Sequence, residues 1–71
     1  MEKIEIKIGE KWYSVGDTVE MTVSKKTFLG RKDVQRKYIV TFIGNDSVST
    51  MISEDGKYEK TIVGRVNITQ I

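Results

Sequence analysis

An all-β fold is what this sequence of 71 residues predicts, and three observations support it. Apolar residues recur at every second position over much of the chain, which is the period of a strand with one buried face. Residues that favour turns separate these stretches. No stretch keeps the i, i+3, i+4, i+7 spacing of an amphipathic helix for more than one turn. One domain is expected, because a chain of this length has room for a single small core.

Two strands are expected in the N-terminal part of the chain. From Glu2 to Ile8, isoleucine alternates with charged residues. From Thr18 to Val23, Val and Met alternate with polar residues. Gly16 precedes the second of these strands and lets the chain bend sharply before it.

A three-stranded meander and a last strand are expected in the remainder. Tyr38 to Ile43 is β-branched or aromatic at almost every position, as in a central strand. Gly44 to Asp46 and Glu54 to Gly56 supply residues that tolerate positive φ and close hairpins. A turn at Gly64 leads into the final strand, Val66 to Ile71. The expected core consists of Val19, Met21, Val23, Ile39 or Val40, Phe42, Val48, Ile52, Ile62, Val66 and Ile68.

Five or six such strands are expected to close into a small SH3-like barrel, because closure removes exposed strand edges. The main alternative, an OB-fold, usually carries a helix between its third and fourth strands, and no segment here can form it. The strand from Glu2 to Ile8 lies outside the five barrel strands. It either pairs within its own chain or forms a homodimer by edge pairing.

The motifs GDTVE at Gly16 to Glu20, NDSV at Asn45 to Val48 and TIV at Thr61 to Val63 carry a family resemblance. In this order they resemble the pattern of a family of short, uncharacterised SH3-like barrel proteins from Gram-positive bacteria and their phages. The resemblance covers roughly residues 15 to 71 and implies the fold, with no activity attached. Gly64 to Val66 departs from the family, which tends to have Asn-His-Lys at this turn.

The segment Lys25 to Lys37, KKTFLGRKDVQRK, holds six of the twelve Lys and Arg residues and one of the ten acids. Its formal charge of +5 contrasts with −3 on the rest of the chain. Such asymmetry indicates a contact surface for an anionic partner. A long, mobile basic loop from Ser24 to Lys37 is therefore predicted. The candidate binding residues are Lys25, Lys26, Phe28, Leu29, Arg31, Lys32, Arg36 and Lys37.

Two aromatic or apolar pairs leave alternatives open. Phe28 and Leu29 either fold back on the barrel or stand out as an anchor for a partner. Trp12 and Tyr13 either close one end of the core or form a second contact surface, since exposed rings serve as interface hot spots or as platforms for bases.

Composition excludes most catalytic chemistry. Without Cys or His, the chain has no thiol or imidazole for nucleophilic, redox or metal chemistry. A small barrel fills its interior with side chains and leaves no substrate pocket, so no enzyme and no cofactor are expected. Glu54 and Asp55 lack a third convergent ligand, so no metal site is expected. No apolar run approaches the roughly 20 residues of a membrane span, and a cytoplasmic protein without a membrane partner is expected.

Two classes of binding function remain. The preferred hypothesis is a protein-interaction module, such as an adaptor or inhibitor from a phage or mobile element, that docks on an acidic surface through the basic loop. The alternative is a nucleic-acid-binding module that uses the same loop on phosphate groups. Acids spread over the rest of the chain and a single Phe in the loop favour the protein partner, because nucleic-acid binders usually space aromatic residues among their positive charges.

Overall fold

The computed structural model describes residues 1–71 and contains strands without any helix, so the all-β prediction is confirmed. Seven strands are present, more than the five or six expected. They are β1 (Glu2–Ile8), β2 (Lys11–Tyr13), β3 (Thr18–Thr27), β4 (Gly30–Ile43), β5 (Val48–Ser53), β6 (Glu59–Val63) and β7 (Val66–Gln70).

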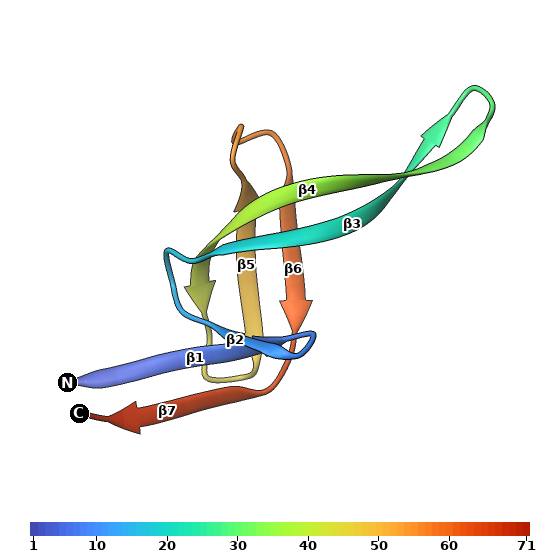
Figure 1. The fold of residues 1–71 in the computed structure, drawn as a ribbon. Coiled ribbons are helices and arrows are strands. Elements are labelled where there is room, and N and C mark those ends of the chain that lie inside the picture. Colours follow the sequence, from blue (N-terminus) through green and yellow to red (C-terminus); the bar gives the residue numbers. More distant parts are fainter.

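The strands form two antiparallel sheets rather than one closed barrel (Figure 1). One sheet has the order β2-β1-β7, and the other has the order β3-β4-β5-β6. The predicted meander is confirmed by the pairing of β4 with β5 and of β5 with β6. Figure 1 shows the β3–β4 hairpin leaving the body at one end and the paired β1 and β7 leaving it at the other.

The buried core is small. Only nine of the 71 residues are buried, and the apolar ones are Ile6, Val19, Tyr38, Val40, Ile43 and Met51. They come from β1 and from three neighbouring strands of the larger sheet, so the smaller sheet closes one side of the core. Met21, Val23, Ile62 and Val66 pack against this cluster as partly buried residues, in agreement with the sequence prediction.

Phe42 was predicted in the core, and this prediction is wrong because a β-bulge interrupts β4. Val40 pairs with Met51, but Phe42 pairs with Thr50, so Thr41 is an extra residue. The Thr41 hydroxyl donates to the carbonyl oxygen of Thr50 at 3.0 Å. A bulge shifts the alternation of side chains by one residue, and it turns Phe42 outward with 59% of its surface exposed.

Other members of the predicted core also lie outside it. Of the alternatives Ile39 and Val40, Val40 is the buried residue, whereas Ile39 lies on the opposite face of the sheet. Val48 and Ile52 alternate with the buried residues of β5 and are half-buried on that opposite face. Ile68 is exposed because it lies on the part of β7 that leaves the body beside β1.

The first strand, β1, pairs within its own chain on both sides. Glu2 to Ile6 pair with β7, and Ile6 to Ile8 pair with β2. Of the two alternatives that the sequence left open, pairing within the same chain is the one observed, and β1 is the central strand of the smaller sheet. Edge pairing with a second copy is open to β1 only at its N-terminal half, on the side that β2 does not reach.

The segment from Ser24 to Lys37 was predicted to be a long, mobile loop, and this prediction is wrong. It is the far part of the β3–β4 hairpin, and its backbone pairing is continuous from Thr18 with Ile39 to Thr27 with Gly30. The hairpin makes the molecule elongated, with extents of 50 × 21 × 18 Å. Its radius of gyration is 13.7 Å, compared with about 11 Å for a compact domain of this length.

The burial of Met51 gives the first prediction. Met51 is 0% exposed, at the centre of the core. Met51→Ala should lower the free energy of unfolding by about 2 to 5 kcal/mol, because the truncation leaves a cavity. Phe42→Ala is the control and should cost no more than about 1 kcal/mol, because the ring lies outside the core. Urea denaturation at low micromolar protein measures both, and equal losses would contradict the position of the bulge.

Candidate functional site

The end of the β3–β4 hairpin exposes two large apolar side chains. Thr27 pairs with Gly30, so Phe28 and Leu29 are the two residues of the turn. Gly30 takes a φ of 126°, which side chains with a Cβ rarely adopt. The Thr27 hydroxyl donates to the Gly30 carbonyl at 2.8 Å and closes the turn. Phe28 is 102% exposed and Leu29 is 95% exposed, so they stand out as an anchor and do not fold back.

Four cations follow directly behind this apolar end. Lys26 pairs with Arg31, and Lys25 pairs with Lys32 on the next rung of the ladder. Directly opposed residues lie on one face of a sheet, and successive rungs alternate between faces. The hairpin therefore carries one pair of positive charges on each of its two faces.

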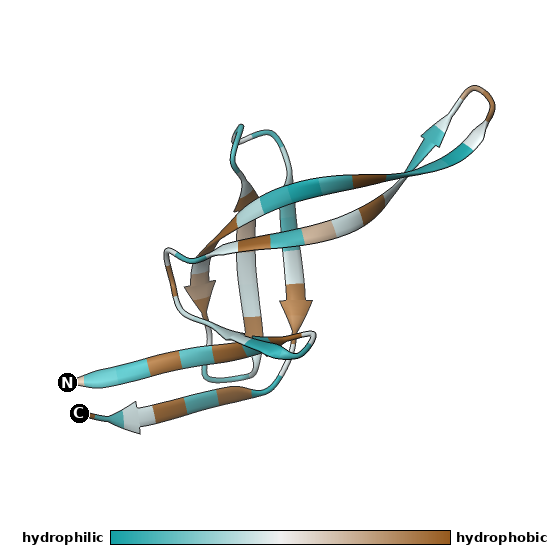
Figure 2. Cartoon of the chain, viewed as in Figure 1, coloured by the Kyte–Doolittle hydropathy of each residue, from teal (hydrophilic) through white to brown (hydrophobic).

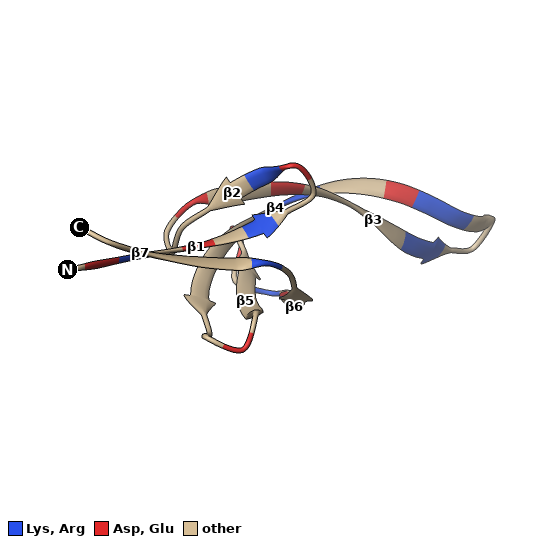
Figure 3. Ribbon diagram, turned by 90° about the horizontal axis from the view of Figure 1, so that it is seen from below, with Lys and Arg blue, Asp and Glu red and all other residues tan.

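No acid neutralises these four cations. The only ion pair of the structure joins Lys3 and Glu5, at 3.9 Å, at the other end of the molecule. Asp33 is the one acid on this part of the hairpin, and it lies across from Ser24. Figure 3 shows the positive residues on both strands near the hairpin end. Like charges directly opposite each other destabilise a sheet, so the hairpin holds an unfavourable arrangement that an anionic partner would relieve.

Arg36 and Lys37 were predicted to belong to the same site, but they lie near the base of the hairpin. Arg36 stacks its guanidinium on the ring of Tyr58, 3.7 Å from the ring centroid. This contact holds the base of the hairpin to the residue that precedes β6. Lys37 pairs across the ladder with Glu20. The structure brings together the other six predicted binding residues: Lys25, Lys26, Phe28, Leu29, Arg31 and Lys32.

The second predicted surface, Trp12 with Tyr13, is divided between two roles. Tyr13 pairs with Ile6 and packs against the core. Trp12 points to the opposite face of the short strand β2, opposite Lys7, and is 39% exposed. A single half-exposed indole does not form a stacking platform, because a platform needs successive rings.

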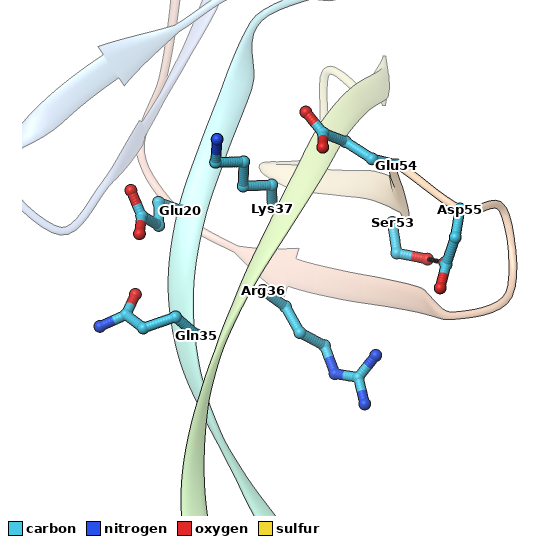
Figure 4. Close-up of a pocket in the computed structure, with 7 residues that line it drawn as sticks. All are labelled: Glu20, Gln35, Arg36, Lys37, Ser53, Glu54 and Asp55. Atoms are coloured by element: carbon cyan, nitrogen blue, oxygen red, sulfur yellow. Dashed lines mark hydrogen bonds between the residues drawn. The ribbon is translucent and has the colours of Figure 1, made fainter.

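A polar hollow of about 420 Å³ lies between the base of the hairpin and the β5–β6 turn. No hydrophobic residue lines it, and its lining is Glu20, Gln35, Arg36, Lys37, Ser53, Glu54 and Asp55. Figure 4 shows the polar ends of these side chains spread around β4 and not directed at one point. Such an arrangement lacks the convergence that acid–base chemistry on a bound substrate requires.

Asp55 organises the β5–β6 turn beside this hollow. Its Oδ1 accepts a hydrogen bond from the Ser53 hydroxyl at 2.5 Å and another from the Lys57 N–H at 3.1 Å. The Ser53 hydroxyl in turn accepts from the Tyr58 N–H at 3.0 Å. The hydrogen bond from Ser53, followed by that from Lys57, lowers the pKa of the Asp55 carboxyl, because both favour the charged form. These hydrogen bonds all lie within one turn and serve its structure. The end of the β3–β4 hairpin is therefore the candidate site.

Sequence reasoning singled out the six residues that lie together at the hairpin end but not their secondary structure. The signal that it missed is a symmetry about Phe28 and Leu29. Val23 and Val34 are equally distant from the turn and face each other in the ladder, and Gly30 follows the turn. The density of charge concealed this symmetry, because clustered Lys and Arg are usually a sign of loops or tails.

No protein-family model, curated protein or solved structure matches this chain. The family resemblance carried by the sequence motifs therefore stays a prediction. No helix in the structure is long and apolar enough to span a membrane.

The opposed cations give a prediction about the free hairpin. Lys25→Glu should slow amide hydrogen exchange in the distal hairpin about 1.5- to 5-fold, because an opposite-charge pair with Lys32 is worth roughly 0.2 to 1 kcal/mol. Lys11→Glu on β2 makes the same change of charge elsewhere and serves as the control. Unchanged or faster exchange in Lys25→Glu would contradict the pairing of Lys25 with Lys32.

The Asp55 contacts predict a dependence of stability on pH. Because the folded pKa lies below the unfolded value of about 3.9, the carboxylate stabilises the fold fully above that value and loses this effect as the pH falls through the folded pKa. Asp55→Ala should therefore lower the urea midpoint of unfolding at neutral pH. The difference in urea midpoint between this variant and the unmodified protein should become smaller below about pH 4. Glu54→Ala is the neighbouring control. A difference that persists at the lowest pH would contradict this role.

Proposed function

We propose that this protein is a non-enzymatic binding module that docks the end of its β3–β4 hairpin on an acidic protein surface. The observation that carries the proposal is the fully exposed pair Phe28 and Leu29 at the end of a paired, projecting ribbon, immediately in front of four cations without acidic partners. An adaptor or inhibitor of phage or mobile-element type, acting in the cytoplasm, fits this description.

The apolar end favours a protein as the partner. Interface hot spots are large side chains that enter a desolvated pocket, surrounded by residues that exclude water. Phe28 and Leu29 lead the hairpin and are the first groups to meet a partner, while the cations behind them suit acidic residues at the rim of such a pocket. The remainder of the chain has a formal charge of −2 once these four cations are set aside from the total of +2. A negative body limits the contact with an anionic partner to the hairpin.

Nucleic acid is the second candidate, and the placement of cations on both faces of the ribbon favours it. The major groove of duplex DNA admits a two-stranded β-ribbon, and phosphates line both of its walls. Charges on the two faces of the hairpin would then have partners on both sides.

The SH3-like frame is part of the same proposal. The long hairpin, two further meander strands, the turn at Gly64 and a last strand come in the chain order expected of such a barrel. The last strand, β7, pairs with β1 and not with β3. In this frame the basic hairpin occupies the long connection after the first barrel strand, and the elongated ribbon replaces a flexible loop. Pairing of the backbone reduces the entropy that a loop would lose on binding, so the hairpin is already organised for contact.

Reversal of the four hairpin charges tests the proposal. The variant Lys25→Glu, Lys26→Glu, Arg31→Glu and Lys32→Glu should fold and lose its partner, while Phe28→Ser should weaken binding by about 2 kcal/mol. A photo-crosslinking amino acid at position 28 identifies the partner in extracts of the source cell, and calorimetry with purified proteins measures the affinity. The control is the charge-matched variant Lys3→Glu, Lys7→Glu, Lys11→Glu and Arg65→Glu, which should bind normally.

A parallel titration with a random 20-base-pair duplex separates the two candidates. A protein partner predicts weak binding to the duplex and a strong effect of Phe28→Ser. A nucleic-acid partner predicts that log Kd changes with log salt with a slope of about 3 to 4, close to 0.9 for each of the four cations, and that charge reversal removes this dependence. Full biological activity in the four-charge hairpin variant would refute both candidates.

A further inference from the structure

The outer edge of β7 is a free strand edge. β7 pairs with β1 on one side only and ends the smaller sheet, whose order is β2-β1-β7. Figure 1 shows no strand beside β7 on the side away from β1. A free edge offers a row of N–H and C=O groups that can pair with a further strand.

The pairing with β1 determines which backbone groups lie on this edge. The Lys7 N–H donates to the Arg65 carbonyl at 2.8 Å, and the Ile71 N–H donates to the Met1 carbonyl at 2.9 Å. Hydrogen-bonded and non-hydrogen-bonded pairs alternate along an antiparallel ladder, so every second residue of β7 points its N–H and C=O away from β1. These residues are Val66, Ile68 and Gln70. None of the backbone hydrogen bonds outside the strand ladders engages their groups.

β7 is the only edge strand of the two sheets without a charged residue. Its sequence is VNITQ, whereas the edge strands β2, β3 and β6 contain Lys11, Glu20 and Glu59 among other charged residues. Charged side chains, proline and bulges keep the strand edges of natural proteins from pairing with other chains. β7 has no proline, and its register with β1 has no bulge. Its edge is therefore open to a further strand.

We propose that this edge pairs with the same edge of a second copy of the chain, and that the two β7 strands run antiparallel with Ile68 at the centre. In this register Ile68 lies opposite Ile68 of the second copy, and Val66 lies opposite Gln70. The outward N–H and C=O groups of one edge then all meet those of the other. The two three-stranded sheets join into one sheet about a two-fold axis.

The polar face of β7 fits its own copy in this register. The Asn67 side-chain amide donates to the Thr69 hydroxyl at 3.2 Å, which leaves the Thr69 hydroxyl hydrogen and the Asn67 side-chain carbonyl oxygen for other partners. The register places Thr69 directly opposite Asn67 of the second copy, where side chains are close enough to interact. The Thr69 hydroxyl then donates to the Asn67 side-chain carbonyl across the axis. The hydrogen bonds within and between the copies close a ring around the two-fold axis.

The apolar face matches in the same way. Ile68 pairs with Ile4 of β1 and is 43% exposed. Figure 2 shows hydrophobic bands of β1 and β7 lying side by side. Pairing of the copies places Ile4 and Ile68 of one chain in line with Ile68 and Ile4 of the other. Four isoleucines then form one row across the joined sheet, and such cross-strand apolar pairs stabilise a sheet.

The charges of β1 are compatible with this register. Lys3 pairs with Thr69, and Glu5 pairs with Asn67. The rung that contains Lys3 of one copy therefore contains Glu5 of the other, with both β7 strands between them. No charged side chain of β1 shares a rung with a like-charged side chain of the second copy. A second copy thus meets the hydrogen-bonding, apolar and charge patterns of this edge by symmetry alone, which is the reason for choosing it as the occupant.

The dimer should be weak. One strand added at each edge covers less than the roughly 800 Å² per partner of a standard interface. A Kd between about 1 µM and 1 mM is therefore expected. The proposal uses none of the residues at the hairpin end and stands independently of the proposed function.

Sedimentation equilibrium from about 10 µM to 1 mM tests the proposal, because association depends on concentration. The mass should rise from the 8.1 kDa of one chain toward twice that value. Ile68→Lys and Ile68→Glu should each remain a monomer, because like charges then lie directly opposite each other. An equal mixture of the two variants should associate as a heterodimer, since position 68 lies opposite itself only in the register centred on Ile68. The control Val63→Lys places the same charge on β6, at a residue that is 76% exposed, and should dimerise normally.

Three results would overturn the proposal. They are a monomeric unmodified protein at the highest concentration, a dimer that survives Ile68→Lys, and a mixture of the two charged variants that does not associate. The four-charge hairpin variant should dimerise normally, which separates this result from a failure of the proposed function.

Amide hydrogen exchange tests the same edge in the unmodified protein, without any substitution that could disturb the fold. The amides of Val66, Ile68 and Gln70 should exchange fast in dilute solution and several-fold more slowly in concentrated solution, because pairing protects them. The amides of Asn67 and Thr69 already face β1 and should change little with concentration. Concentration-dependent protection of Asn67 and Thr69 in place of Ile68, or of no residue of β7, would overturn the proposal.

Discussion

The backbone ladder between β3 and β4 is the interaction on which the rest of the structure depends. Its ten rungs run without interruption from the core to the hairpin turn. At the near end the ladder supplies Val19, Tyr38 and the start of the meander. At the far end it supports a turn that has no tertiary contact of its own, so the position of the apolar pair and the four cations follows from backbone pairing alone.

This use of the chain has a cost in burial. Residues beyond Val23 and Val34 contribute to the ribbon and not to the core, and the core retains six apolar side chains. A domain of about 70 residues has little stability to spare even when fully compact. The stacking of Arg36 on Tyr58 holds the base of the ribbon to the β5–β6 turn, and the hydrogen bonds around Asp55 order that turn. They add polar contacts at the place where the apolar core ends.

One extra residue decides which surface the larger sheet presents. Up to Val40, the residues of β4 alternate between the side of the sheet that faces the core and the opposite side. After the bulge at Thr41, Ile43 takes the buried position and Phe42 faces outward. The same insertion thus completes the core and makes the outer face apolar.

Local patterns in the sequence determined the all-β class, the meander, the turns at Gly44 and Glu54, and the six residues gathered at the hairpin end. These features depend on neighbours along the chain, through alternation and turn chemistry. Only the tertiary structure decided that Ser24 to Lys37 is paired, that Glu2 to Ile8 lies inside a second sheet, and that Phe42 is outside the core. Each of these depends on the register between distant strands, and a one-residue shift in register reverses which side chains are buried.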